Sequence, residues 1–473
     1  MKTYPFFVNG DFRATSSTFS VVNPATGEPF AAMSKADRST VAKALSDASN
    51  AFRQWREVPG KARGEFLFRL ADQVRQRRDD FARTITLENG KPLSQSLGEI
   101  DLSEDHLRWF AEEARRGYGR VIPPQYPHKR HLVLKTPIGV VAAIAPWNFP
   151  LMLAVRKIAP ALAAGCTVVL KPASQTPLSA VLSAECVQAV QLPTNVFQFV
   201  SGSAAEIGAE FLENPLCRKI TFTGSTEVGK KLIAGAAAQV KSLALELGGL
   251  APLLVFEDAD LENAIEGIML AKFRNTGQSC IAANRIFVQK SVYVLVLGRL
   301  LPKVRALKVG DGLEPGVQIG PLVDRAAVTK AHEHVNDAVA RGAKLLCGGK
   351  PLLGRGYFFE PTVLADVAGD SLCLREETFA PVLPVLPFDT EAEAIEMANN
   401  TPFGLSAYAF TRDVDRVFRL GETLEAGIIG INDGLPTASH TPFGGVKQSG
   451  WGRELGQEGM EAFLDTKHIS LSI

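Results

Sequence analysis

Residues 222–231 read Phe-Thr-Gly-Ser-Thr-Glu-Val-Gly-Lys-Lys, and this stretch decides the predicted fold. An apolar segment ends at a glycine turn, and a helical pattern begins directly after it. Amides at the start of a helix are free to bind an anion, so we expect Gly224 and Ser225 to hold a pyrophosphate. The stretch nearly matches a P-loop, but Lys231 stands where magnesium binding needs Ser or Thr, which argues against a nucleotide hydrolase.

Apolar runs and helical patterns alternate on both sides of this unit. The predicted strands are residues 140–145, 167–170, 196–200, 220–223 and 242–245. Such an alternation predicts an α/β protein with a parallel, doubly wound sheet that binds ligands beyond the carboxyl ends of its strands. A second series begins at 253–256, with a helix over 260–274, and predicts a second α/β domain.

Composition excludes several classes of protein. The 473 residues suffice for two or three domains, and 51 basic against 50 acidic residues argue against nucleic acid or an anionic membrane as partner. Six cysteines without paired spacing predict no disulfide framework and no metal site, so we expect a cytoplasmic protein. The longest apolar stretch, 138–155, contains two prolines and is predicted as strand, loop and helix, not as a membrane span.

Three reactive side chains stand where apolar runs give way to loops. Cys280 follows a glycine turn, Asn148 lies in Pro-Trp-Asn-Phe-Pro, and Glu246 lies in Leu-Glu-Leu-Gly-Gly. A thiol, an amide and a carboxylate are the parts needed for acyl transfer through a covalent intermediate. A single cysteine is more often inert core, and Glu246 could be a surface carboxylate, but its leucine and glycine neighbours argue against a solvated helix face.

On these motifs the sequence resembles the aldehyde dehydrogenase family, and within it most resembles the succinate-semialdehyde dehydrogenases. The match runs from Val-Asn-Pro-Ala-Thr-Gly at 22–27 to Pro-Phe-Gly-Gly-Val-Lys-Gln-Ser-Gly at 442–450. The resemblance implies a Rossmann-type cofactor domain, an α/β catalytic domain and a small β oligomerisation element, assembled into a homodimer or homotetramer. The expected boundaries are 1–118 and 138–248 for the NAD(P)-binding domain, 249–448 for the catalytic domain, and 119–137 and 460–473 for the oligomerisation hairpin and C-terminal strand.

The resemblance also implies a mechanism. The Cys280 thiolate attacks the aldehyde carbon, and the Asn148 amide and the Cys280 backbone N–H hold the oxyanion. Glu246 then activates a water that hydrolyses the thioester. Relatives that pass the acyl group to coenzyme A as a rule lack this glutamate, so Glu246 favours hydrolysis.

Further cofactor contacts follow from the same resemblance. Lys171 matches a lysine that binds the adenosine ribose, Glu377 a carboxylate that binds the nicotinamide ribose, and Phe379 the ring beside it. Cofactor binding is also expected of Trp147, Leu247, Gly224 and Ser225. Ser174 stands where NAD-restricted relatives often have Glu, so the repulsion of a 2′-phosphate is absent and we expect NADP to be accepted; whether NADP or NAD is preferred stays open.

Two arginines define the expected substrate class. Arg156 lies about two helical turns after Asn148, and Arg274 lies shortly before Cys280. Both match arginines that bind the substrate carboxylate in succinate-semialdehyde dehydrogenases, and guanidinium groups suit a carboxylate. The loop at 434–441 lacks the usual serine pattern, so either Ser439 takes over substrate binding or His440 selects a different anion.

Several hypotheses remain at this point. The first is NAD(P)-dependent oxidation of a short acid semialdehyde, with succinate semialdehyde to succinate as the best guess. The alternatives are another anionic aldehyde (glutarate semialdehyde, a sulfonated or a phosphonated aldehyde) and general neutral aldehydes, with the arginines merely structural. A catalytically silent binding protein is disfavoured because the chain retains Cys280, Glu246, Asn148, Lys171 and Glu377 together.

Overall fold

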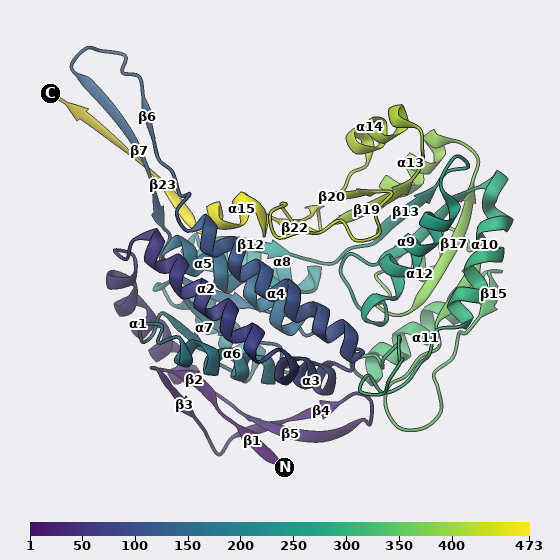
Figure 1. The fold of residues 1–473 in the computed structure, drawn as a ribbon, viewed down its shortest axis with the longest axis horizontal. Coiled ribbons are helices and arrows are strands. Elements are labelled where there is room, and N and C mark those ends of the chain that lie inside the picture. Colours follow the sequence, from purple (N-terminus) through teal and green to yellow (C-terminus); the bar gives the residue numbers. More distant parts are fainter.

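The computed structural model describes residues 1–473 and contains two large sheets, each covered by helices (Figure 1). The first sheet has eight strands in the order β22-β12-β11-β8-β9-β10-β2-β3. Its strands are β2 (Phe6–Val8), β3 (Asp11–Arg13), β8 (Val140–Ile144), β9 (Thr167–Lys171), β10 (Phe197–Phe199), β11 (Cys217–Thr223), β12 (Ser242–Glu246) and β22 (Gly450–Trp451). The five strands from β8 to β12 pair in parallel, which confirms the predicted doubly wound α/β fold.

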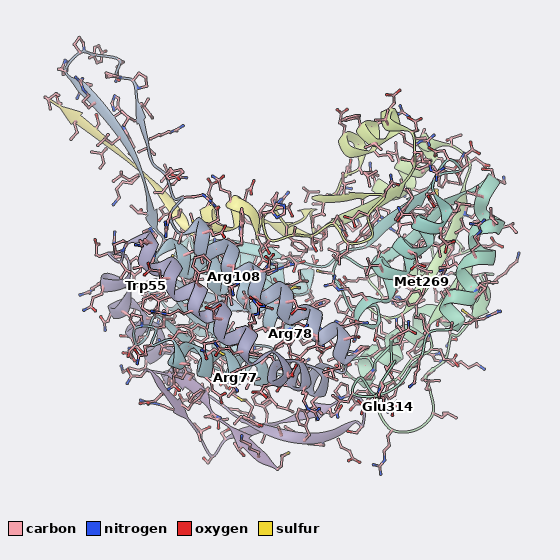
Figure 2. All side chains as sticks on the ribbon, viewed as in Figure 1. Trp55, Arg77, Arg78, Arg108, Met269 and Glu314 are labelled. Atoms are coloured by element: carbon pink, nitrogen blue, oxygen red, sulfur yellow. The ribbon has the colours of Figure 1, made fainter.

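Helices cover both faces of this sheet. They are α1 (Arg38–Trp55), α2 (Gly60–Gln76), α3 (Arg78–Asn89), α4 (Leu93–Glu113), α5 (Pro150–Ala164), α6 (Leu178–Ala189), α7 (Ala204–Glu213), α8 (Thr226–Ala236) and α15 (Gly456–Glu461). Arg77, Arg78 and Arg108 lie on the outer layer, on or beside α3 and α4 (Figure 2). Helix α5 packs against α2 and α4, and every one of its residues is buried, which explains the long apolar stretch in the sequence.

The second sheet is formed by the later half of the chain, in the order β15-β16-β17-β14-β13-β19-β20. Its strands are β13 (Ala251–Val255), β14 (Ala283–Gln289), β15 (Lys344–Cys347), β16 (Thr362–Ala365), β17 (Val382–Phe388), β19 (Ser406–Phe410) and β20 (Ile428–Ile431). Its helices are α9 (Leu261–Phe273), α10 (Lys290–Arg305), α11 (Arg325–Ala340), α12 (Leu372–Arg375), α13 (Glu391–Asn399) and α14 (Val414–Thr423). Two separate hydrophobic clusters involve this sheet, so it has cores of its own.

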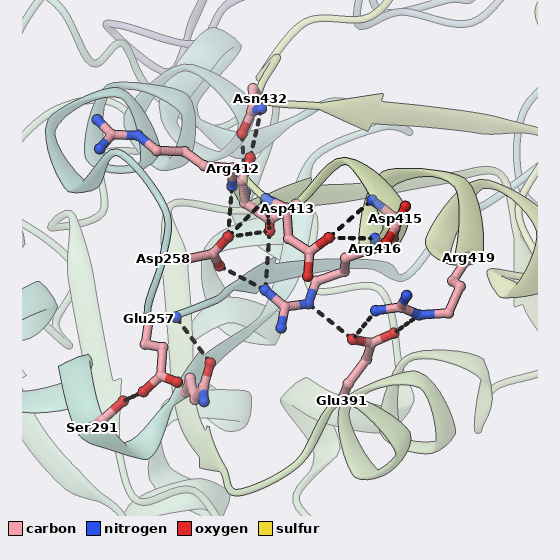
Figure 3. A network of polar contacts seen from close by, with 12 residues as sticks. Glu257, Asp258, Ser291, Glu391, Arg412, Asp413, Asp415, Arg416, Arg419 and Asn432 are labelled. Carbon is pink, nitrogen blue, oxygen red and sulfur yellow. Dashed lines mark hydrogen bonds and ion pairs between the residues drawn. The ribbon is translucent and has the colours of Figure 1, made fainter.

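A network of ion pairs joins the helices at one end of the second sheet (Figure 3). Arg416 donates to Asp258, in the turn after β13, and to Glu391 at the start of α13. Arg419 also donates to Glu391 and is the main reason that the pKa of this carboxyl falls to about 2. The network lies partly exposed at the surface, and we assign it a structural role in holding α13 and α14 to the sheet.

A small antiparallel sheet protrudes from the body of the molecule (Figure 1). It consists of β6 (Arg120–Ile122), β7 (Lys129–Pro137) and β23 (Leu464–Ser472), with β7 in the middle, so β23 and β6 leave free edges. The remaining short strands are β1 (Lys2–Tyr4), β4 (Thr18–Asn23), β5 (Glu28–Ser34), β18 (Phe403–Gly404) and β21 (Val446–Lys447). None of the helices has the length and hydropathy of a membrane span. The predicted domain boundaries stay a prediction.

Candidate active site

One cavity gathers residues from both large sheets. It is lined by Pro146, Trp147, Asn148, Thr223, Gly224, Ser225, Glu246, Leu247, Gly248, Cys280, Glu377 and Phe379. Nine of these are residues that the sequence predicted for the site. The other three, Pro146, Thr223 and Gly248, are chain neighbours of predicted residues, and that adjacency could have identified them. Of the predicted residues, Lys171, Ser174, Arg156, Arg274 and Ser439 do not line this cavity.

The backbone before Cys280 is strained. Asn275, Thr276 and Gly277, in the short turn η2 (Arg274–Gly277), have φ angles of 51°, 58° and 76°, all left-handed. A non-glycine residue held there costs about 1–3 kcal/mol. Asn275 is held by its bond to the Asn148 carbonyl (2.8 Å), and a Cβ on Gly277 would lie 2.4 Å from the Ala380 carbonyl oxygen. The strained turn brings the thiol to the cavity.

Asn148 is clamped from two directions. Its backbone carbonyl accepts from the Lys91 Nζ (2.6 Å) as well as from Asn275, and its side-chain Nδ2 donates to the Gln278 carbonyl (3.1 Å). Lys91 is fully buried and pairs with Glu99 at 2.6 Å. Glu99 in turn accepts from the first amides of α5. The local sequence gives no sign of the Lys91–Glu99 pair, because Lys91 lies in the short connection between α3 and α4 and Glu99 lies on α4, both places where a charged residue is ordinary.

Glu246 and Cys280 form an electrostatically coupled pair. Glu246 ends β12, is 2% exposed, and neither of its carboxylate oxygens has a hydrogen-bond partner in the protein. Its pKa is raised to about 7, mainly by burial and to a smaller extent by the Glu454 charge, while Cys280, Lys157 and Arg156 oppose the rise. Burial also raises the pKa of the Cys280 thiol, and the Glu246 charge adds to that shift. A carboxyl that titrates near neutrality can gain and lose a proton at working pH.

The two arginines lie near Cys280 without a carboxylate partner. Arg156 on α5 is 4% exposed, its Nε donates to His106 Nε2 (3.2 Å), and its guanidinium lies 4.4 Å from the Phe443 ring centroid. The guanidinium of Arg274 lies 4.7 Å from the Phe149 ring centroid.

Burial lowers the pKa of both arginines, and the Arg156 charge lowers that of Arg274 further. The opposing influences are Glu454, Cys280 and Glu246 on Arg156, and Tyr408, Glu99 and Cys280 on Arg274, none of them in an ion pair with the arginine. The two cations therefore lie near each other and near the thiol. Two like charges held close together and largely out of water are costly unless an anion compensates them.

The sequence offered Ser439 or His440 as the substrate-binding residue of the 434–441 loop, and the structure places Ser439 in a hydrogen-bond network. Its side chain is buried, its Oγ bonds His106 Nδ1 (2.7 Å), and it also donates to the Asp105 carboxylate. The hydroxyl proton is therefore already engaged. His440 is exposed and lies against Trp109.

The start of α8 provides the expected anion cradle. Ser225 is its N-cap, and the Ser225 hydroxyl accepts from the Val228 amide (3.3 Å). Gly229 lets the helix pack closely on the sheet, since a Cβ there would lie 2.5 Å from the Leu247 side chain. These are the roles that glycines play in a dinucleotide-binding βα turn.

Other groups around the cradle also suit a dinucleotide. Lys171 ends β9, is buried, and its Nζ bonds only the Pro172 carbonyl (3.3 Å), so burial lowers its pKa to about 8. Glu377 accepts from the Gly249 amide (3.3 Å), and burial raises its pKa to about 8. The Phe379 ring meets Trp147 edge-on at 5.5 Å. A buried amine with a spare donor, a free helix start and a carboxylate fit the phosphates and riboses of a nicotinamide dinucleotide.

A doubly wound sheet with a dinucleotide cradle beside a half-buried thiol and a buried carboxylate defines a nicotinamide-dependent oxidoreductase with a covalent intermediate. Residues 12–469 match the family model described as the aldehyde dehydrogenase family, and the chain belongs to this family.

Three similar proteins illustrate the range of relatives. Glutarate-semialdehyde dehydrogenase of Pseudomonas aeruginosa is 49% identical over 96% of this chain and 94% of its own length. 3-Sulfolactaldehyde dehydrogenase of Pseudomonas putida is 46% identical over 98% of this chain and 96% of its own. The crystal structure of succinate-semialdehyde dehydrogenase from Burkholderia pseudomallei superimposes with a TM-score of 0.98 at 45% identity, covering 99% of this chain and 98% of that one.

Proposed function

We propose that this aldehyde dehydrogenase oxidises a short aldehyde with an anionic far end, and that succinate semialdehyde, giving succinate, is its substrate. The observation that carries the proposal is the pair of arginines near Cys280, Arg156, which is buried, and Arg274, which is half-buried, neither of which forms an ion pair with a carboxylate. An anionic substrate would supply the missing charge. The names of the three relatives each denote an aldehyde with an acid group, which supports this class of substrate.

In the proposed mechanism Cys280 is the nucleophile. Its thiolate adds to the aldehyde carbon, and the developing oxyanion is stabilised by the Cys280 backbone N–H and the Asn148 Nδ2, which has a second proton to donate beside its bond to Gln278. Bound NAD(P)⁺ supplies the hydride acceptor that turns the adduct into a thioester. Glu246 takes a proton from water as the water attacks the thioester carbonyl. The C–S bond then breaks, the carboxylic acid is released, and the proton returns from Glu246 to the Cys280 sulfur.

The cofactor is proposed to bind along the edge of the first sheet. The amides at the start of α8 and Ser225 would hold the pyrophosphate, Lys171 the adenosine ribose, and Glu377 the nicotinamide ribose, with Trp147, Phe379, Gly224 and Leu247 forming the walls. Because Ser174 places no acid beside Lys171, we propose that NADP is accepted as well as NAD.

We also propose the domain division and the assembly expected from the sequence. The cofactor domain (1–118 and 138–248) is supported by one large hydrophobic cluster, which also includes a few residues of the catalytic domain (249–448), and the catalytic domain has two further clusters of its own. All six cysteines are free, as suits the cytoplasm. The free edges of the protruding sheet, from 119–137 and 460–473, support a homodimer or homotetramer.

Replacing Arg274 tests the proposed anion site. We expect Arg274→Ala to raise KM for succinate semialdehyde roughly 30-fold or more, because about 2 kcal/mol or more of charge-assisted bonding is lost. KM for butanal, which is neutral, should stay unchanged. Steady-state kinetics measure both, and Arg299→Ala, on the exposed face of α10, is the matched control. An unchanged KM for the anionic aldehyde in Arg274→Ala would refute the site.

The raised pKa of Glu246 gives a pH dependence. Below pH 7 the carboxyl is protonated and cannot accept a proton from water, so thioester hydrolysis should rise with pH and level off above about 7. Glu246→Gln should slow hydrolysis by about 10²–10⁴. Stopped-flow measurements should then show one equivalent of reduced cofactor forming before turnover stalls. Undiminished steady-state turnover in this variant would exclude Glu246 as the base.

Replacing Ser174 tests the cofactor proposal. A carboxylate in Ser174→Glu would repel a 2′-phosphate, so we expect kcat/KM for NADP to fall about tenfold or more, corresponding to about 1.4 kcal/mol, with NAD little affected. Ser174→Ala, which adds no charge, should keep its activity with NADP. Equal use of NADP by the Glu variant and the unmodified protein would contradict the proposal.

Removing β23 tests the assembly. The unmodified protein should sediment as a dimer or tetramer, and a chain that ends at Phe463 should sediment as a smaller species, because an edge strand is lost. Circular dichroism checks that the shortened chain is folded. An unchanged mass in sedimentation velocity would show that β23 does not hold the subunits together.

A further inference from the structure

A chain of hydrogen bonds leads from Arg156 to the surface of the protein. Arg156 Nε bonds His106 Nε2 (3.2 Å), His106 Nδ1 bonds Ser439 Oγ (2.7 Å), and Ser439 bonds the Asp105 carboxylate. His106 and Asp105 lie on α4, Arg156 lies on α5, and Ser439 lies on the loop after β20. Arg156 and His106 are buried, whereas Asp105 is exposed. The chain therefore connects three separate segments.

Chemistry allows one direction for every bond in this chain. Arginine is always protonated, so its Nε–H donates and His106 Nε2 must accept. The proton of the neutral imidazole is then on Nδ1 and donates to the Ser439 hydroxyl. That hydroxyl donates to the Asp105 carboxylate, which can only accept. A protonated His106 would turn a second N–H towards Arg156, and burial together with the Arg156 charge lowers the pKa of His106 well below its ordinary value.

This arrangement satisfies Arg156 without neutralising it. A carboxylate in direct contact would form an ion pair and compete with an anionic ligand for the guanidinium. Arg156 Nε instead bonds the neutral ring of His106. The negative charge in this series of hydrogen bonds is on Asp105, which is separated from Arg156 by His106 and Ser439 and faces solvent. Of the two terminal nitrogens of Arg156, Nη2 has the sulfur of Met152 as its only acceptor (3.9 Å), and Nη1 has no hydrogen-bond partner.

Further contacts hold the residues of this hydrogen-bond chain in place. The Arg156 guanidinium packs on the Phe443 ring, so rotation about its long side chain is restricted. The Ser439 carbonyl accepts from the Gly456 amide (2.9 Å), which fixes the loop that carries the hydroxyl. Rotating His106 away would leave the buried Nε–H of Arg156 without an acceptor, which is costly.

We propose that His106 is the positioning residue for Arg156 in recognising the anionic end of the substrate, and that Ser439 and Asp105 hold His106 in the required tautomer. The proposal rests on the proposed function, since it assumes an anionic aldehyde. It gives Ser439 an indirect role in place of the direct substrate contact that the sequence suggested. His106 acts through Arg156 and does not touch the reacting atoms.

Replacing His106 gives the main test. His106→Leu removes the acceptor for Arg156 Nε, and we expect KM for succinate semialdehyde to rise about tenfold or more, with kcat within about twofold. Kinetic constants for butanal should not change, because no charge is recognised there. His106→Gln places an amide oxygen near the position of Nε2 and should recover most of the lost affinity. A general disturbance of folding would affect both aldehydes and would not be rescued by Gln.

Two further variants keep the test decisive. Ser439→Ala leaves His106 in place but removes its link to Asp105, so a smaller rise in KM, about threefold, is expected with the anionic aldehyde alone. Ser103→Ala, also buried on α4 but outside the chain, is the matched control and should behave as the unmodified protein. If His106→Leu does not fold, Ser439→Ala decides, and an unchanged KM there overturns the proposal.

The outcomes separate this inference from the proposed function. If the unmodified protein oxidises butanal and succinate semialdehyde equally well, the proposed function fails and the inference fails with it. If the unmodified protein prefers the anionic aldehyde and loses that preference in Arg274→Ala but keeps it in His106→Leu, the anion site stands and His106 is not its positioning residue. Loss of the preference in both variants, with rescue by His106→Gln, supports the inference.

Discussion

The backbone carbonyl of Asn148 is the point on which the geometry of the site depends. It accepts one hydrogen bond from Lys91, held by Glu99 among the helices of the first sheet, and another from Asn275, in the strained turn that precedes Cys280. A single acceptor therefore links the first sheet to the segment that carries the thiol. Lys91 and Glu99 are fully buried, and removing one member of such a pair leaves an uncompensated charge, at a cost of about 3–5 kcal/mol. The link is correspondingly rigid.

The charged residues of the site differ in whether an opposite charge lies beside them. Lys91 has Glu99 and Lys157 has Glu454, so these buried cations are structurally satisfied. Arg156 and Arg274 are not, since their neighbours are aromatic rings, a neutral imidazole and a sulfur atom. Glu246 has no hydrogen-bond partner either. Unsatisfied groups of both signs near one thiol are costly for folding and useful for binding and proton transfer, as expected of a functional site.

Much of the fold and part of the site could be predicted from local sequence. The βα unit at 222–231, the strands at 140–145 and 242–245 and the helix before Cys280 have local patterns of apolar residues and glycines that depend little on distant contacts. Glu246 and Asn148 were identifiable because they lie at or just after the carboxyl end of a strand, where parallel sheets place their ligands, and Cys280 because it follows a glycine turn between a helix and a strand. The structure brings these three residues into one cavity.

The sequence by itself determined the doubly wound architecture, the family and the types of reactive group, since these follow from short-range patterns. Only the tertiary structure decided which polar and charged side chains form hydrogen bonds or ion pairs with one another. The contact of His106 could not be predicted from sequence, because a histidine on an amphipathic helix is ordinary. Only packing brings Arg156 on α5, 50 residues later in the chain, against it. Ser439 was one of two candidates for substrate binding in its loop, and nothing in that loop reveals that its hydroxyl donates to Asp105, 334 residues away. Hydrogen bonds between distant segments depend on packing, and packing leaves no local pattern in the chain.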